Sequence, residues 1–340
     1  MRDYSKFIKQ PSLILWNIWT RVARFVKSDE LYLRVYYWLR TGKKLDLDNP
    51  KSFTEKIQWL KIYCNRTPEC SVMVDKYAVK KYVADRIGEE YIIPTYGVWD
   101  NFDDIDISSL PNQFVLKTTH SSGGIYICKD KSLFDYSDAR KKIVGSLKRE
   151  IVYRSREYQY GGVRPRILAE KYMEDETGEL KDYKFFCFNG SPKVLFYASD
   201  RYSTNKGGVK FDYYDMDYNL LPITSQGHGH SDVLLTKSPV IEKMKKLSAI
   251  LSKGYPFLRV DFYCIRGAIF FGELTFHHDG GIVPFEPEEW DYKLGEMIQL
   301  PQKKKFKWHG NMRWRKRSIP THSEWLYPLT FDAGKGLKEA

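Results

Sequence analysis

Apolar residues recur at helical spacing through the N-terminal part of the chain. The pattern predicts one or two helices, rich in Trp and Tyr, between about residues 12 and 40, with their end marked by Thr41-Gly42. Ser52 or Thr54 can cap a further helix that continues through IQWLKIY. Another helix is predicted from Asp75 to about residue 86, in DKYAVKKYVADR. The chain is therefore expected to begin with a helical region.

From Phe114 onwards, short apolar runs bounded by turn residues replace the helical spacing. QFVLKTTHSSGGIYICKD predicts a strand, a glycine-containing loop and a second strand. Further strands are predicted at 167–173 and in a hairpin at 182–200 that turns at Asn189-Gly190, and helices are predicted at 136–154 and 240–251. Because the strands follow one another without regularly alternating helices, the fold class is predicted to be α+β with antiparallel strands.

A second hairpin carries the clearest candidate chemistry. LRVDFYC (258–264) and FFGELTF (270–276) are predicted strands on either side of Arg266-Gly267. With a three-residue loop centred on Gly267, Asp261 lies opposite Glu273, and the alternate residues form an apolar face. Two like charges placed directly opposite each other destabilise a sheet, so this pair requires a compensating cation.

Two cations can satisfy these carboxylates. Oxygen ligands in small number suit Mg²⁺, which keeps several waters and is completed by substrate phosphates. The same register places Arg259 opposite Thr275 on the carboxylate face, so the alternative is that one carboxylate pairs with Arg259 or simply faces water.

Lys117 precedes a second candidate feature. It ends a predicted strand and is followed at once by the loop TTHSSGG at 118–124. Such a loop can close over phosphates and point backbone amides at them. It is not a P-loop, because the lysine precedes the glycines, and a plain hairpin turn is the alternative.

Charge is concentrated near the C-terminal end. The net charge is +12, and residues 302–317 hold eight Lys or Arg and no acid, interleaved with Phe306, Trp308 and Trp314. This basic segment is compatible with contact to nucleic acid or an anionic membrane surface, and equally with a solvated extension.

The cysteines and the N-terminal residues indicate in which cellular compartment the protein is expected. The five cysteines are odd in number and form no CxxC, so neither a disulfide framework nor a zinc site is indicated, and a reduced cytosolic compartment fits best. The apolar run near the N-terminus is interrupted by Arg21 and Arg24, so it is too short and too charged to span a bilayer. Packing on the body of the protein is expected, with an interfacial amphipathic helix as the alternative.

Several of these stretches, taken in order, resemble the TupA-like branch of the ATP-grasp superfamily. The stretches are NPKSFTEKIQWLKIY, DKYAVKKYV, the Lys117 strand with its loop, EKYM at 170–173, DYKFFCFNG, and Arg259-x-Asp261 with GELTF. The resemblance covers about residues 40–300. It implies the ATP-grasp fold, in which helices accompany antiparallel sheets and ATP is held between two subdomains. The expected divisions are an N-terminal helical region 1–74, subdomains 75–165 and 166–301, and a basic tail 302–340.

The resemblance also implies roles for individual residues. Lys117 and Lys184 are expected to contact the phosphates of ATP, and the loop residues Ser121, Ser122, Gly123 and Gly124 are expected to close over them. The backbone of Glu170, Lys171, Tyr172 and Met173 is expected to contact the adenine, and Asp182 is expected to lie near the ribose. Mg²⁺ is expected on Asp261 and Glu273, with Thr275 standing where many relatives have Asn. The remaining roles are stabilisation of an acyl phosphate (Arg259, and Arg201 unless it only caps a turn) and contact with the reacting substrate (His277, His278, Gly280, Gly281).

The activity implied is that of an ADP-forming carboxylate-amine ligase acting through an acyl phosphate. The expected partners are ATP, a carboxylate-bearing glycan of the capsule or its precursor, and an amino acid or peptide amine. Two alternatives stay open: a kinase of the same fold that phosphorylates a hydroxyl, and a non-catalytic binder of membrane or nucleic acid. A nucleic-acid partner is not expected. The protein is expected to be cytoplasmic, and peripheral contact with the inner face of the membrane through 302–317 stays open.

Overall fold

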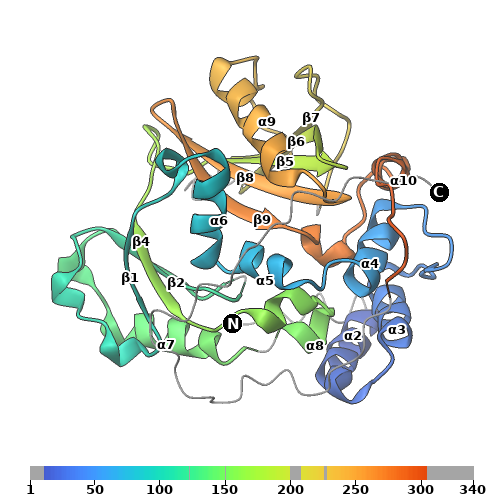
Figure 1. Cartoon of the computed structure of the whole chain (residues 1–340), viewed down its shortest axis with the longest axis horizontal. Helices are drawn as coiled ribbons and strands as arrows, with labels where there is room; N and C mark the ends of the chain where they lie inside the picture. The colour runs from blue at the N-terminus through green and yellow to red at the C-terminus, as the bar shows by residue number, and fades with distance from the viewer. Residues whose placement is uncertain (1–10, 122, 150, 200–207, 226–227, 305–340) are drawn as a thin grey trace, which may run out of the picture. The chain divides into compact units, whose positions relative to one another are not determined.

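The computed structural model describes residues 11–121, 123–149, 151–199, 208–225 and 228–304 (Figure 1). These residues belong to one contact unit, Met1–Trp308. Ser122, Arg201 and all but the first three residues of the basic segment 302–317 lie outside the described residues.

Two antiparallel sheets form the frame of this unit (Figure 1). The first has the order β1-β4-β2-β3, with β1 at Thr95–Trp99, β2 at Phe114–Thr118, β3 at Ile125–Cys128 and β4 at Ile167–Lys171. The second has the order β7-β6-β5-β8-β9, with β5 at Asp182–Phe188, β6 at Ser191–Ser199, β7 at Lys210–Tyr214, β8 at Phe257–Ile265 and β9 at Ala268–Thr275. The predicted α+β class with antiparallel strands is confirmed.

Helices surround both sheets. They are α2 (Pro11–Val22), α3 (Asp29–Thr41), α4 (Phe53–Tyr63), α5 (Pro68–Val74), α6 (Ala78–Ile87), α7 (Tyr136–Leu147), α8 (Val152–Ser155), α9 (Pro239–Ser252) and α10 (Glu289–Glu296). The predicted helix at 136–154 is thus two helices. Among the described residues, no helix is both long and apolar enough to cross a membrane.

Local sequence signals account for several element boundaries. Ser52 begins α4 with a capping box, in which its hydroxyl accepts from the Glu55 amide and the Glu55 carboxylate accepts from the Ser52 amide. Gly42 ends α3 in the left-handed region, with φ 74°. Asn189 and Gly190 turn the β5–β6 hairpin at φ 50° and 80°, as a two-residue type I′ turn requires.

The N-terminal helices are part of the main core. Phe53 of α4 is 1% exposed and packs its ring against the second sheet, with centroids 4.9 Å from Phe257 and 6.2 Å from Phe186. It also lies 5.3 Å from Phe285, which precedes α10. The opposite face of this sheet is covered by α9, whose Met244 and Leu251 are buried against it. Residues before 75 therefore do not form a separate layer.

Strand β4 belongs to the first sheet, although it follows residue 166, where the C-terminal subdomain was expected to begin. It pairs with β1 on one side and β2 on the other. Its Ile167 and Ala169 are fully buried in the core of the first sheet. The chain therefore passes from the first sheet to the second after Lys171.

Replacing Phe53 by Ala should destabilise the whole unit. A fully buried phenylalanine leaves a cavity when truncated, which costs about 3 to 5 kcal/mol of unfolding free energy. Urea unfolding of the wild type and Phe53→Ala measures this loss. Leu133→Ala is the control, because Leu133 is 81% exposed and its truncation should change the unfolding free energy little. A loss below 1 kcal/mol for Phe53→Ala would contradict the packing described.

Candidate active site

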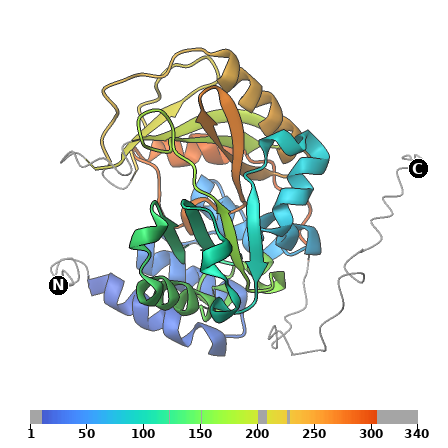
Figure 2. The ribbon, with the colours of Figure 1, turned by 90° about the vertical axis from the view of Figure 1, so that its left-hand side faces the viewer.

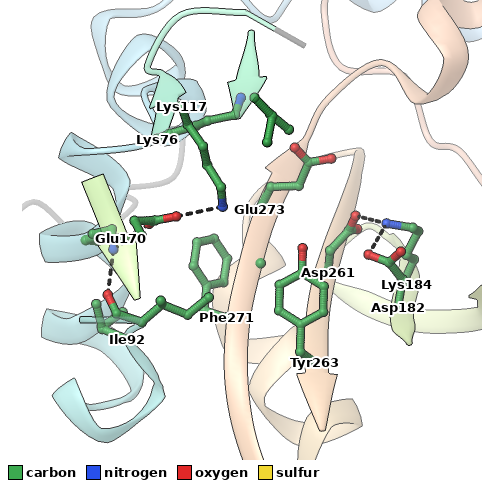
Figure 3. Close-up of a pocket in the computed structure, with 14 residues that line it drawn as sticks. Lys76, Ile92, Lys117, Glu170, Asp182, Lys184, Asp261, Tyr263, Phe271 and Glu273 are labelled. Carbon is green, nitrogen blue, oxygen red and sulfur yellow. Dashed lines mark hydrogen bonds and ion pairs between the residues drawn. The ribbon is translucent and has the colours of Figure 1, made fainter. Parts of the chain in front are cut away.

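A pocket lies between the two sheets, and Figure 3 shows side chains from both entering it. Its described lining holds four lysines and four carboxylates. They are Lys76, Lys80, Lys117 and Glu170 on the side of the first sheet, and Asp182, Lys184, Asp261 and Glu273 on the second. The rest of the lining is Gly272 and five largely apolar side chains: Ile92, Ile93, Ile125, Tyr263 and Phe271. The six residues among these that the sequence assigned to ATP or metal therefore converge on one pocket.

The β8–β9 hairpin has the predicted register at the site but a different turn. Asp261 lies opposite Glu273, and Arg259 lies opposite Thr275. The loop is a two-residue turn, Arg266-Gly267, not the expected three-residue loop, and β9 carries a bulge at Gly272. The extra residue in the bulge offsets the shorter turn, because each moves the register by one position.

The facing carboxylates are compensated by Arg259. Its Nε and one terminal nitrogen donate to the two oxygens of Asp261 at 2.7 and 2.8 Å, and the latter nitrogen also donates to Glu273 at 2.6 Å. Lys184 donates to Asp261 at 2.6 Å and to Asp182 at 2.9 Å. Arg259 therefore forms ion pairs with both carboxylates.

Asp261 and Glu273 differ in their access to the pocket. The Asp261 side chain is 1% exposed, whereas that of Glu273 is 45% exposed. Burial alone raises the pKa of Asp261, but Arg259 and Lys184 outweigh it and hold the pKa below its usual value. Thr275 donates to Glu273 at 3.2 Å, so its hydroxyl lies on the same edge. Asp261 is thus held in the charged form.

The opposite wall is built around Glu170. Lys80 and Lys117 each approach a different oxygen of its carboxylate at 2.6 Å. Burial raises the pKa of Glu170, yet the two lysines lower it overall. Lys76 donates to the carbonyl of Ser121 at 2.9 Å, which ties it to the glycine loop.

The sequence analysis assigned no role to Lys76 or Lys80. Lys76 precedes α6 and Lys80 lies in its first turn, and the four-residue spacing would place two side chains on one face of a helix. Burial lowers the pKa of both amines. Their four-residue spacing was the only sequence signal that could have indicated a shared site, but two lysines at a helix start are equally typical of a solvated surface.

The glycine loop connects β2 to β3. The Thr118 amide donates to the Gly124 carbonyl at 3.1 Å, and the Ser121 hydroxyl bonds with those of Thr118 and Ser146 at 2.8 and 2.9 Å. Gly124 has φ 64°, and a Cβ there would stand 2.1 Å from the Ser146 hydroxyl. The Ser121 side chain therefore faces α7, and Gly124 is required by close packing. Gly123, at φ 112°, is the second left-handed glycine of the loop.

The end of β4 contributes the Glu170 side chain to the pocket. Lys171 is exposed, and the Tyr172 hydroxyl donates to Glu174 at 2.8 Å. Met173 is half-buried. None of these three side chains lines the pocket. The expected contact of this backbone with adenine stays a prediction.

The predicted substrate loop lies beside Arg259, in the 3₁₀ turn η7 (His278–Gly281). Arg259 donates to Nδ1 of His278 at 2.9 Å. Burial lowers the pKa of His278 to about 4, so the imidazole is neutral and accepts this bond. The carbonyl of Gly280 accepts from Lys61 at 2.6 Å, and that of Gly281 accepts from Gln58 at 2.6 Å. Helix α4 therefore holds this turn in place through side-chain hydrogen bonds to its backbone carbonyls.

His277 precedes this turn and is buried away from the pocket. Its ring nitrogens lie 3.1 Å from Asn65 and 3.1 Å from Gln159, and 3.2 Å from Glu157. His277, His278 and the two glycines are not part of the described pocket lining. Their contact with substrate stays a prediction, and their observed contacts position the loop.

Two antiparallel sheets with a charged pocket between them are the arrangement of the ATP-grasp fold. A sequence profile described as TupA-like ATP-grasp matches residues 55–299. Because this match covers more than two thirds of the sequence, the chain belongs to the TupA-like ATP-grasp family. Members of the ATP-grasp family are ATP-dependent ligases that use ATP with Mg²⁺.

The chain is also similar to several solved structures. D-alanine–D-alanine ligase from Bacillus anthracis has 15% sequence identity over 72% of each chain, with a TM-score of 0.39. The chain covers 54% of the same ligase solved with ATP. The Helicobacter pylori ligase has 14% identity over 75% of this chain and 68% of its own, with a TM-score of 0.40. No curated protein matches. The family assignment rests on the profile, not on these likenesses.

The buried Lys61 beneath the loop gives a prediction on pH. Burial lowers its pKa from 10.5 to about 8. Between these two values the unfolded chain holds a proton that the folded chain lacks, so raising the pH through this window stabilises the fold. Relative to Lys61→Met, the wild type should therefore gain about 1 to 3 kcal/mol of unfolding free energy between pH 8 and pH 10.5.

Urea unfolding at several pH values checks this prediction. Lys81→Met is the control, since the Lys81 side chain is 82% exposed and its removal should leave the pH dependence unchanged. A constant free-energy difference between wild type and Lys61→Met across the window would contradict the buried position of the amine.

Proposed function

We propose that the chain is an ADP-forming carboxylate-amine ligase whose reaction takes place in the pocket between the two sheets. The observation that carries this proposal is the division of charge across the pocket. Lysines tied to Glu170 and to the glycine loop form one wall, and paired carboxylates on β8 and β9 form the other. Polyphosphate and its metal ion need these two groups together.

The lysine wall suits the phosphates of ATP. Lys117 and Lys80 share one carboxylate, so the three groups together carry one excess positive charge. An incoming phosphate can compensate this charge. Lys184, on the second sheet, adds a further cation beside Asp261. The isoleucines Ile92, Ile93 and Ile125 give the pocket an apolar part that suits a nucleobase.

The carboxylate wall fits Mg²⁺. Among the described residues there is no group of three or more metal-ligating side chains, so a protein-only cage is not formed. Mg²⁺ is typically held by one or two carboxylates and completed by substrate phosphates and water, which matches Asp261 with the half-exposed Glu273. Thr275 lies beside them as a further oxygen. When bound, the ion would neutralise charge on the phosphates.

The proposed chemistry needs no protein nucleophile. A carboxylate oxygen of the substrate attacks the γ-phosphorus of ATP. The bond between this phosphorus and the β–γ bridging oxygen breaks, and ADP leaves with that oxygen. An amine then attacks the acyl carbon, inorganic phosphate leaves, and the amine gives up a proton to form the amide. Arg259, whose guanidinium is fixed by its hydrogen bond to His278, would stabilise charge on the acyl phosphate.

The substrates are proposed from the family. The TupA-like branch is associated with capsule and cell-envelope polysaccharides, so we place the carboxylate on a uronic acid of such a glycan or its precursor, and the amine on an amino acid or peptide. The reaction would take place in the cytoplasm. His277, His278, Gly280 and Gly281 would border the reacting carbonyl.

A coupled assay of ADP and phosphate release tests the proposal. Amino acids paired with uronic acids are screened with the full chain, Mg²⁺ and ATP, and the product is identified by mass spectrometry. A ligase yields an amide and free phosphate. A phosphorylated sugar without free phosphate would establish the kinase alternative and overturn the ligase assignment.

Once an active pair of substrates is known, Glu273→Gln and Asp261→Asn should each lower the rate by about 100-fold or more, because each removes a negative charge proposed to hold the Mg²⁺. Glu174→Gln is the matched control, since Glu174 is similarly exposed but lies outside the pocket lining. Unfolding midpoints separate loss of activity from loss of fold. Full activity in both pocket variants would refute the assignment of the carboxylates.

A further inference from the structure

Helix α2 presents an apolar face that the fold does not use. Ile14, Ile18 and Val22 are spaced by four residues and are 46%, 52% and 38% exposed, and the adjacent Leu15 is 55% exposed. Single exposed aliphatic residues are ordinary, but residues at this spacing form one continuous stripe. We call these four residues the α2 stripe. In Figures 1 and 2, α2 lies along the lower edge of the described chain.

The opposite face of α2 fixes the helix to the protein. Trp16 packs against Tyr36 with ring centroids 5.5 Å apart, and Trp19 stacks on Tyr32 at 5.6 Å. The Trp19 ring nitrogen also donates to the backbone carbonyl of Tyr32 at 3.1 Å. The helix is therefore held by its aromatic face, and the stripe points away from the core as a fixed surface. Sequence alone left open whether this segment packs or lies at an interface, and the structure shows packing by one face only.

The charge along the segment that carries the stripe is of one sign. Residues 11–28 hold three basic residues, Arg21, Arg24 and Lys27, and no acid. All three are exposed. Phe25, in the turn that follows α2, is 69% exposed, and the Arg24 guanidinium lies 4.9 Å from the centre of its ring. An aliphatic stripe with cations beside it and an aromatic residue at its end is the composition of interfacial helices.

We propose that the α2 stripe docks on an anionic lipid surface. Aliphatic side chains would enter the boundary between headgroups and acyl chains, while the arginines and the lysine meet the negative headgroups. A second copy of the chain is a poorer occupant, because a symmetric contact through this face would bring two basic, acid-free segments together. The proposal is independent of the proposed ligase activity and of the basic segment 302–317.

Vesicle binding of the full chain tests this docking. Cosedimentation is measured with vesicles of phosphatidylglycerol and phosphatidylcholine, and with phosphatidylcholine alone. The wild type should bind the anionic vesicles more tightly. The combined variant Ile14→Ser, Ile18→Ser, Val22→Ser keeps every charge of the chain and should bind about tenfold or more weakly, because it removes buried aliphatic area.

A matched control separates the stripe from general apolar exposure. Leu133→Ser with Val233→Ser removes residues that are 81% and 75% exposed elsewhere, and this variant should bind like the wild type. Arg21→Gln with Arg24→Gln should weaken binding to anionic vesicles about 25-fold, since each charge near such a surface contributes about fivefold.

Several results would overturn the proposal. One is equal binding by the wild type and the triple serine variant, which would place the contact elsewhere, such as in residues 302–317. Another is absence of binding to either vesicle. A third is a wild-type dimer in light scattering that the triple variant converts to monomer, since the stripe would then be an interface between copies. Unchanged unfolding midpoints show that the variants remain folded.

Discussion

The buried guanidinium of Arg259 is the group on which the site depends. It lets Asp261 and Glu273 stand directly opposite each other in a sheet, where two like charges would otherwise be destabilising. Removing one partner of such a buried network leaves an uncompensated charge, whereas replacing the whole network by apolar residues is often harmless to stability. The arrangement is therefore poorly explained by stability and well explained by a need for carboxylates at this place.

Arg259 also connects the pocket to the N-terminal helices. It donates to His278, whose turn is held through the carbonyls of Gly280 and Gly281 by Lys61 and Gln58 of α4. Helix α4 in turn is fixed by Phe53 in the aromatic core of the second sheet. The helical region before residue 75 thus takes part in holding the site, although the sequence pattern alone suggested a separate region.

Much of the site was predictable because its residues come in a specific order along the chain. Lys117, Glu170, Asp182, Lys184, Asp261 and Glu273 were named from that order, and all line one pocket. The pairing of Asp261 with Glu273 was predicted from strand alternation with a turn one residue too long. The predicted pairing is still correct, because the bulge at Gly272, which the sequence pattern did not reveal, shifts the register back by one residue.

Other features were not predictable for physical reasons. Strand β4 pairs with β1 and β2, which are far from it in sequence, and alternation of side chains carries no information on which strands become neighbours. Lys76 and Lys80 have the spacing of any solvated helix start, so only the tertiary position of Glu170 distinguishes them. His277 and His278 follow β9 as the family pattern implies, but their burial and their bonds to Glu157 and Arg259 depend on segments distant in sequence.

The central claim, that the pocket between the two sheets binds Mg·ATP, is tested most directly by calorimetry. Binding of ATP is measured with and without Mg²⁺ for the wild type and for Lys117→Ala, with Lys129→Ala, an exposed lysine outside the pocket lining, as the control. The account predicts Mg²⁺-dependent ATP binding that Lys117→Ala weakens about tenfold or more and the control leaves unchanged. Absence of nucleotide binding, or equal binding by wild type and Lys117→Ala, would contradict it.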